Sequence, residues 1–121
     1  MAAEHDFGCD QGTYWSQQLI WYDESGTNPI DISTWHARMQ IRRQVQAGEY
    51  LIQLTDDPGD GITLGGADGT ILLEMSAEQT ADLPAVKGGN RHYYDLEMVP
   101  SDGKVRRLVQ GRFLVSAEVT R

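Results

Sequence analysis

Three short stretches of the chain bring together side chains that could perform chemistry. The first lies at the N-terminus and combines a histidine, a thiol and two carboxylates, which are His5, Cys9, Asp6 and Asp10. Zinc sites usually draw on paired cysteine or histidine ligands at fixed spacings, and this chain has one cysteine. We therefore interpret Cys9 as a free thiol, which forms no internal disulfide, and we expect no metal site.

The second and third stretches are turns rich in glycine or aspartate. The segment TDDPGDG, residues 55–61, places Asp56, Asp57 and Asp60 close together, as a calcium loop would. Pro58 stands where an EF-hand has its second ligand, and no glutamate closes the loop. The segment GGADGT, residues 65–70, lacks the Lys-Ser/Thr pair and the following helix of a phosphate-binding loop. We interpret both segments as turns.

Catalysis finds little support in the remaining polar residues. The three histidines, His5, His36 and His92, are far apart and share no motif, and the chain has no G-x-S-x-G nucleophile elbow. We expect His36 on the solvent face of a strand and His92 at the start of another. The sequence therefore predicts no enzyme activity and no cofactor.

The elements that position these residues are predicted to be short β-strands. Apolar and polar residues alternate in 14–22, 35–42, 50–55, 62–64, 71–75, 94–98 and 105–115, with turn residues between them. This pattern is typical of an antiparallel β-sandwich. The period breaks at SAEQTADLP, where Ser76 and Gln79 form a capping box and Pro84 follows, which predicts one short helix near residues 76–83.

The same alternation predicts which side chains face the core. The expected inward residues are Trp15, Leu19, Trp21, Trp35, Ala37, Met39, Ile41, Ile52, Leu54, Ile62, Leu64, Ile71, Leu73, Met75, Tyr94, Leu96, Met98, Val105, Val109, Phe113 and Val115. Arg107 interrupts the apolar side of the last strand, which a bulge or register shift nearby would explain. We expect Gly111 to mark that bulge.

Length and charge restrict the class of protein. The 121 residues suit a single domain, 1–121, whose first ten residues we expect to form a flexible N-terminal arm. The net charge of −8 argues against a nucleic-acid partner. No apolar run reaches the length of a membrane span, and the N-terminus does not resemble a secretory signal. We expect a protein made in the cytosol, without membrane or nucleic-acid contacts.

Charge is distributed unevenly along the chain. Residues 1–37 contain six Asp or Glu and no Lys or Arg, which gives −6, whereas residues 87–121 contain seven basic and four acidic residues, which gives +3. Two interpretations stay open. The asymmetry is either a solvated distribution without a role, or it suits subunits that meet head to tail with opposite charges facing.

Two sets of outward residues are candidates for a protein interface. The alternation that buries Trp15 turns Tyr14, Ile20 and Tyr22 to the other side of the strand. These three are either an exposed apolar row, which usually marks a partner, or part of a strand buried on both faces. On another strand, Arg38 and Arg42 lie on the outer, basic side. We therefore take Tyr14, Ile20, Tyr22, Arg38 and Arg42 as candidate interface residues.

Several motifs taken in sequence order resemble a known family. They are ARMQIRR, GITLGGADGTILLEMSAEQTADLPA and YYDLEMVPSDGKVRRLVQGRFLVSAEVTR. Over most of its length, from Phe7 to Thr120, the chain resembles the small immunoglobulin-like proteins encoded among the structural genes of tailed bacteriophages. It is similar to the N-terminal domain of the phage baseplate upper protein. It departs from the pattern in PAVKGGNRH, residues 84–92, which is longer than the turn expected there.

The resemblance implies an immunoglobulin-like antiparallel β-sandwich that serves as a structural virion protein. It implies an assembly or adaptor component of the tail, baseplate or neck, with other phage structural proteins and copies of itself as partners. It implies no catalytic or cofactor-binding residues. Two alternatives stay open, a capsid decoration (cement) protein and a carbohydrate-binding β-sandwich module, the latter because outward aromatic rings can stack on sugars.

Overall fold

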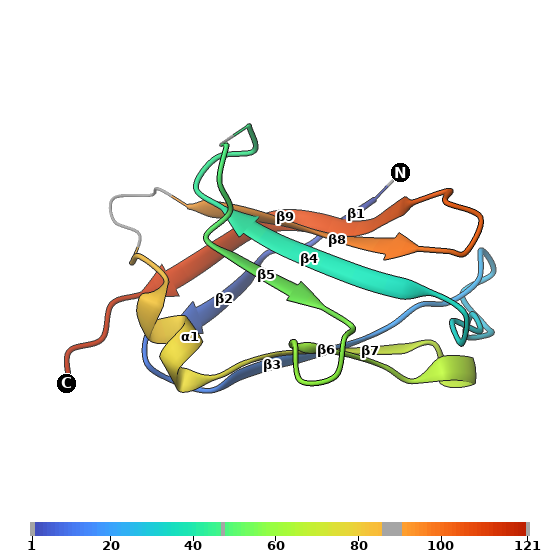
Figure 1. Ribbon diagram of the computed structural model, residues 1–121, viewed down its shortest axis with the longest axis horizontal. Helices are drawn as coiled ribbons and strands as arrows, with labels where there is room; N and C mark the ends of the chain where they lie inside the picture. Colours follow the sequence, from blue (N-terminus) through green and yellow to red (C-terminus); the bar gives the residue numbers. More distant parts are fainter. Residues whose placement is uncertain (1, 47, 86–90, 121) are drawn as a thin grey trace.

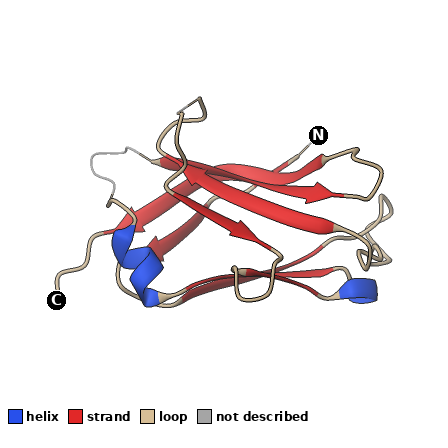
Figure 2. Cartoon of the chain, in the orientation of Figure 1, coloured by secondary structure: helices blue, strands red, loops and turns tan. Residues whose placement is uncertain are grey.

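Two β-sheets face each other in the computed structural model, which describes residues 2–46, 48–85 and 91–120 (Figure 1). Within this part, a short helix, α1 (Ala77–Asp82), lies at one end of the two layers (Figure 2). The all-β sandwich and the helix near residues 76–83 are thus confirmed. The immunoglobulin-like topology that the resemblance implies stays a prediction.

The strands divide unequally between the sheets. Among the described residues the larger sheet contains β1 (Ala3–Glu4), β2 (Phe7–Asp10), β4 (His36–Arg42), β5 (Ile52–Thr55), β8 (His92–Val99) and β9 (Arg106–Ser116). Its order is β1-β9-β8-β4-β5, and β2 also pairs with β9. The smaller sheet has the order β3-β7-β6, with β3 (Trp15–Ile20), β6 (Ile62–Leu64) and β7 (Thr70–Met75), and a 3-10 turn, η1 (Gly66–Asp68), joins β6 to β7.

The core lies between the sheets and is built from the inward residues of both, because successive side chains of a strand point to opposite faces. An aromatic cluster occupies its centre, where the Phe7 ring stacks on Tyr94 at 4.7 Å and the Trp15 ring meets Phe113 edge-on at 5.4 Å. Most of the predicted inward residues are buried. Leu19, Trp21, Trp35, Ile52 and Leu64 pack against the core and are partly buried.

Register between β8 and β9 shifts once, and this shift accounts for Arg107. Leu96 lies opposite Val109 whereas Glu97 lies opposite Arg107, so β9 contains one extra residue, Leu108. The extra residue turns Arg107 to the outer face, as the interrupted pattern suggested. The predicted inward position of Val105 is wrong for the same reason, since this residue precedes the shift and is 41% exposed.

The predicted bulge at Gly111 is also wrong, since this residue pairs regularly with Tyr94. The absence of a side chain at Gly111 instead allows the N-terminal segment to approach β9 closely. A methyl group at Gly111 would lie 2.1 Å from the carbonyl oxygen of His5, which passes directly over it. Glycine is therefore required here by the path of the N-terminal segment and not by the geometry of β9.

That N-terminal segment differs from the flexible arm expected for the first ten residues. β1 and β2 both pair with β9 in parallel, with Ala3 opposite Val109 and Phe7 opposite Phe113. Phe7 and Cys9 point into the core, where both are buried. The alternation over Phe7–Asp10 was too short to be recognised as a strand, and burial of Phe7 fixes it in the sheet.

The helix α1 begins as the capping box predicted. The Ser76 hydroxyl accepts a hydrogen bond from the Gln79 N–H (3.1 Å), and the Gln79 side chain accepts one from the Ser76 N–H (2.9 Å). In the segment that follows, residues 86–90 lie outside the described residues. No helix in the described part of the chain is long and apolar enough to cross a membrane.

Candidate protein-interaction surfaces

The tyrosine row, which we define as Tyr14, Ile20 and Tyr22, is exposed. Their exposed fractions are 61%, 41% and 43%, whereas Trp15, on the opposite side of the strand, is buried. Burial on both faces is thus wrong for this strand. The Tyr14 hydroxyl donates a hydrogen bond to the Glu74 carboxylate on β7, which raises the pKa of Tyr14. The row therefore lies on the outer face of the smaller sheet, with Ile20 on β3, Tyr14 just before this strand and Tyr22 just after it.

The outer face of the larger sheet is polar and hollowed by a groove of about 850 Å³. Its lining side chains come from β1, β4, β5, β8, β9 and nearby loops, and include Glu4, Asp6, Arg38, Gln40, Arg42, Gln53, Tyr93, Asp95, Glu97, Arg107, Gln110 and Arg112. The charges follow the strands. Basic side chains stand on β4 and β9, and acidic ones on β8 between them, so rows of opposite sign alternate across the sheet.

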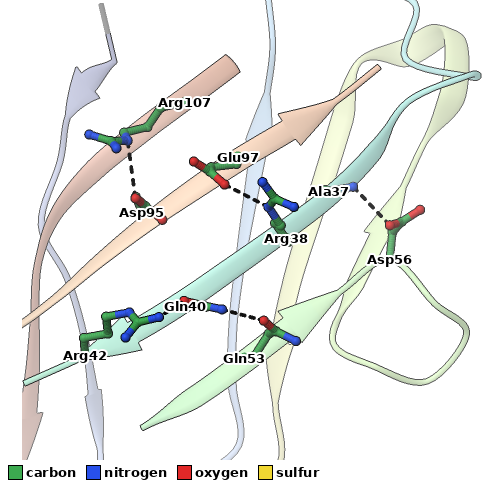
Figure 3. A network of polar contacts seen from close by, with 9 residues as sticks. All are labelled: Ala37, Arg38, Gln40, Arg42, Gln53, Asp56, Asp95, Glu97 and Arg107. Carbon is green, nitrogen blue, oxygen red and sulfur yellow. Dashed lines mark hydrogen bonds and ion pairs between the residues drawn. The ribbon is translucent and has the colours of Figure 1, made fainter. Parts of the chain in front are cut away.

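These rows are joined by ion pairs and hydrogen bonds (Figure 3). The Arg38 Nε donates to the Glu97 carboxylate at 2.8 Å, and Arg107 Nε lies 3.3 Å from the Asp95 carboxylate. The Arg42 guanidinium donates to the Gln40 side chain at 2.7 Å. The basic row predicted on β4 is therefore present, but the acidic row of β8 balances its charge.

The charge balance between the rows is incomplete at Asp95, because this residue is partly buried. Partial burial raises the pKa of the Asp95 carboxyl above its usual value, and the neighbouring negative charge of Glu97 raises it further. Arg107, Arg42 and Arg38 act in the opposite direction without reversing the net shift. The neighbouring arginines therefore do not fully offset the cost of ionising the Asp95 carboxyl in the groove.

Contacts within one chain account for part of the charge asymmetry along the sequence. Because β1 and β2 lie beside β9, acidic N-terminal side chains come next to the basic last strand. The Asp6 carboxylate accepts a hydrogen bond from the Arg112 backbone N–H at 2.9 Å, and Glu4 accepts one from the Gln110 side chain at 2.7 Å. Head-to-tail contact between subunits stays a prediction, because these contacts form within a single chain.

The acidic turn after β5 holds the end of β4. The Asp56 carboxylate accepts a hydrogen bond from the Ala37 N–H at 3.0 Å and lies 2.8 Å from the His36 ring nitrogen. Partial burial raises the pKa of Asp56, but the Ala37 hydrogen bond and His36 outweigh it, so the net pKa lies below its usual value. Asp60 accepts a hydrogen bond from the Thr55 hydroxyl. These two carboxylates therefore have structural partners within the chain.

The remaining candidates for chemistry are separated in space. Cys9 is buried, and burial together with the nearby charge of Asp10 raises the pKa of its thiol to about 11. His92 begins β8 as expected, but it is buried and its ring nitrogen lies 2.7 Å from the Pro84 carbonyl oxygen. Among the described residues, no group of three or more His, Cys, Asp or Glu side chains is placed to hold a metal ion.

The groove was missed at the sequence level, although a signal for it exists. In HYYDLEMV the outward positions of the strand carry Tyr93, Asp95 and Glu97. Their meaning depends on which strand lies beside β8. Once β4 is known to be the neighbour, the outward Asp95 and Glu97 fall next to the outward arginines of β4, and the alternating rows follow.

Comparisons with known proteins leave this chain without an assigned family. No protein-family model matches the sequence, and no curated protein sequence matches it.

Proposed function

We propose that the protein is a structural component of a tailed-bacteriophage particle, which acts in assembly or as an adaptor of the tail, baseplate or neck through protein–protein contacts. The observation that carries this proposal is the tyrosine row, with three large side chains exposed on and beside β3. Exposed aromatic and large apolar side chains that share one face of a sheet are candidates for a protein interaction site. The resemblance of the sequence to phage structural proteins supplies the class of assembly.

The order of the strands supports an immunoglobulin-like topology for this building block. In constant-type immunoglobulin domains, strands B, E and D are neighbours in one sheet, strands C, F and G share the other, and variable-type domains add strand C′ beside C. Numbered along this chain, β3, β7 and β6 take the places of B, E and D, and β9, β8, β4 and β5 take those of G, F, C and C′. The correspondence supports the fold that the resemblance implies.

The groove is the second contact surface in this proposal. Arg38 and Arg42 already have partners within the chain, so they are not a free basic patch. Rows of alternating charge can nevertheless select a partner whose charges match the pattern, because a misplaced like charge is costly. We therefore assign the tyrosine row the main role in affinity and the groove a role in specificity.

Purified particles provide the test. The double variant Tyr14→Ser, Tyr22→Ser removes two rings from the row, and we expect it to fold normally by circular dichroism but to be absent from particles analysed by mass spectrometry. The control is Tyr50→Ser, which removes an exposed tyrosine from the loop between β4 and β5. Incorporation of the double variant at the level of the unchanged protein would refute the assignment of this row.

A capsid decoration protein is the rival within the same class, and labelled copies seen on the head instead of the tail would favour it. The groove favours a carbohydrate-binding module as a second function, because it combines the exposed Tyr93 ring with the amides of Gln40 and Gln53. A glycan array separates this function from the first. Saturable sugar binding that Tyr93→Ala abolishes would establish it, and its absence would leave the structural role.

A further inference from the structure

The strand β3 forms one edge of the smaller sheet as far as the structure describes it. Its backbone groups alternate in direction. On β7, the Glu74 N–H donates to Gly61 on the β6 side, so Glu74 and the residue opposite it, Ser16, exchange no hydrogen bonds with each other. It follows that Ser16, Gln18 and Ile20 direct their backbone N–H and C=O groups away from β7, toward the open edge.

This edge lacks the features that usually protect one. Residues 14–22 contain no charged residue, no proline and no glycine, and β3 pairs with β7 over all six residues without a bulge. The opposite edge of the same sheet, β6, is three residues long, and β5 in the larger sheet is four. A long, regular and uncharged edge strand is a template for pairing with another strand.

We propose that β3 pairs with β3 of a second copy of this chain, antiparallel and across a twofold axis at Gln18, so that the two smaller sheets join into one. This inference deepens the proposed function, because it names the partner of the tyrosine row, and it rests on that function only for its place in a larger assembly.

The register follows from the backbone directions. With the axis at Gln18, Ser16 lies opposite Ile20 of the second copy and Gln18 lies opposite itself, so all three outward residues pair with one another. Each such pair exchanges two hydrogen bonds. A shift of the axis by one residue in either direction leaves one of the three without a partner inside β3. An axis at Gln18 therefore gives hydrogen-bond partners to the largest number of backbone groups on the open edge.

Side chains on the outer face match in the same register. Tyr14 of each copy then lies opposite Tyr22 of the other, so that the two side chains are cross-strand neighbours, and the Gln18 amides meet at the axis. Cross-strand aromatic pairs contribute roughly 0.2–1 kcal/mol each. No charge opposes a like charge, since residues 14–22 carry none. A second copy thus brings the two tyrosines of the row into contact with those of its partner.

Cross-linking tests the register directly. Residues of a hydrogen-bonded antiparallel pair have Cα atoms about 5.5 Å apart, which a disulfide can bridge. We expect Gln18→Cys to form a covalent dimer under mild oxidation. The control is Thr63→Cys, an exposed position on β6 in the same sheet, which we expect to stay monomeric. Cys9 does not compete, because it is buried and the pKa of its thiol is raised to about 11.

Sedimentation equilibrium tests the pairing without a cross-link. We expect the unchanged protein to dimerise with rising concentration and Gln18→Pro to stay monomeric, because proline removes an N–H that points to the open edge and not to β7. Gln53→Pro is the matched control. The Asp56 N–H donates to Ala37 on β4, whereas the Thr55 N–H donates to Asp60, away from β4. Because the backbone direction alternates along a strand, the Gln53 N–H, two residues before Thr55, faces the free edge of β5. This control should still dimerise.

Two results would overturn the inference. One is an unchanged protein that stays monomeric into the millimolar range, and the other is Gln18→Cys that cross-links no faster than Thr63→Cys. Either would leave the proposed function standing if Tyr14→Ser, Tyr22→Ser still fails to enter particles, since the row would then contact a different protein. Failure of the particle test alone would leave dimerisation intact.

Discussion

The hydroxyl group of Tyr94 donates a hydrogen bond to the backbone carbonyl of His5 at 2.5 Å, and so fastens the N-terminal segment across the larger sheet. Tyr94 is buried, and burial raises the pKa of its hydroxyl, with the charges of Asp6 and Glu4 adding to the shift. The hydroxyl therefore keeps its proton over the ordinary pH range and acts as a permanent donor to the segment between β1 and β2.

Removing this donor should loosen the segment. We expect Tyr94→Phe to lower the free energy of unfolding by about 1 kcal/mol, because the His5 carbonyl loses its partner while the core keeps the ring. Urea unfolding measures the change, and amide hydrogen exchange should speed up over residues 3–10. Tyr93→Phe removes a hydroxyl from the outer face of the same strand and should change neither measurement. Unaltered exchange in Tyr94→Phe would contradict the role of this bond.

The close approach of the His5 backbone to Gly111 predicts a larger loss of stability. We expect Gly111→Ala to destabilise the protein by about 3 kcal/mol, since the added methyl group overlaps the His5 backbone, which must then shift. Gly48→Ala is the control, because nothing lies near a methyl group at that position. If displacement of His5 is the cause, adding Tyr94→Phe to Gly111→Ala should cost little more, and fully additive losses would exclude that cause.

The ion pair between Asp95 and Arg107 should contribute no net stability. The pKa of Asp95 is raised in the folded protein, so folding favours its protonated form, and stability falls as pH rises through that pKa. We expect Asp95→Asn to be as stable as the unchanged protein near neutral pH, or more stable by less than about 1 kcal/mol. Unfolding free energies measured across the acid range test this, and a clear loss at neutral pH would contradict it.

Asp56 should show the opposite dependence on pH. Its pKa is lowered in the folded protein, so its contribution is complete above the usual aspartate pKa and is lost as pH falls through the folded value. We expect Asp56→Ala to cost about 1 kcal/mol near neutral pH, and the difference from the unchanged protein to shrink below about pH 4. Asp57→Ala in the same turn is the control. A difference that stays constant on acidification would show that the Asp56 charge is not involved.

Alternation in the sequence predicted the core where strands are regular. Ile71, Leu73 and Met75 are all buried as expected, because β7 lies between two neighbours in the smaller sheet and keeps its period throughout. It misplaced Val105, because an insertion of one residue at Leu108 reverses the two faces of a strand. Arg107 revealed that an irregularity existed, but its position depends on pairing with β8.

Contacts between distant segments could not be predicted from the sequence either, because they also depend on which strands pair. Gly111 has no local signal that distinguishes a bulge from a close crossing, and the crossing depends on His5, more than a hundred residues earlier. The outward direction of Tyr14, Arg38 and Arg42 followed from local period. That Arg38 meets Glu97 while Tyr14 stands on the other sheet followed only from the fold.

Parallel pairing of the first strands with the last has a consequence for how the protein is made. As the chain leaves the ribosome, β1 and β2 lack the ladder partner that the structure gives them until β9 has emerged. Phe7 lies opposite Phe113, so its ring lacks this partner until more than a hundred further residues have been made. Pairing of β1 and β2 with β9 therefore joins segments that are far apart in the sequence, and such long-range pairing is typical of slow folding.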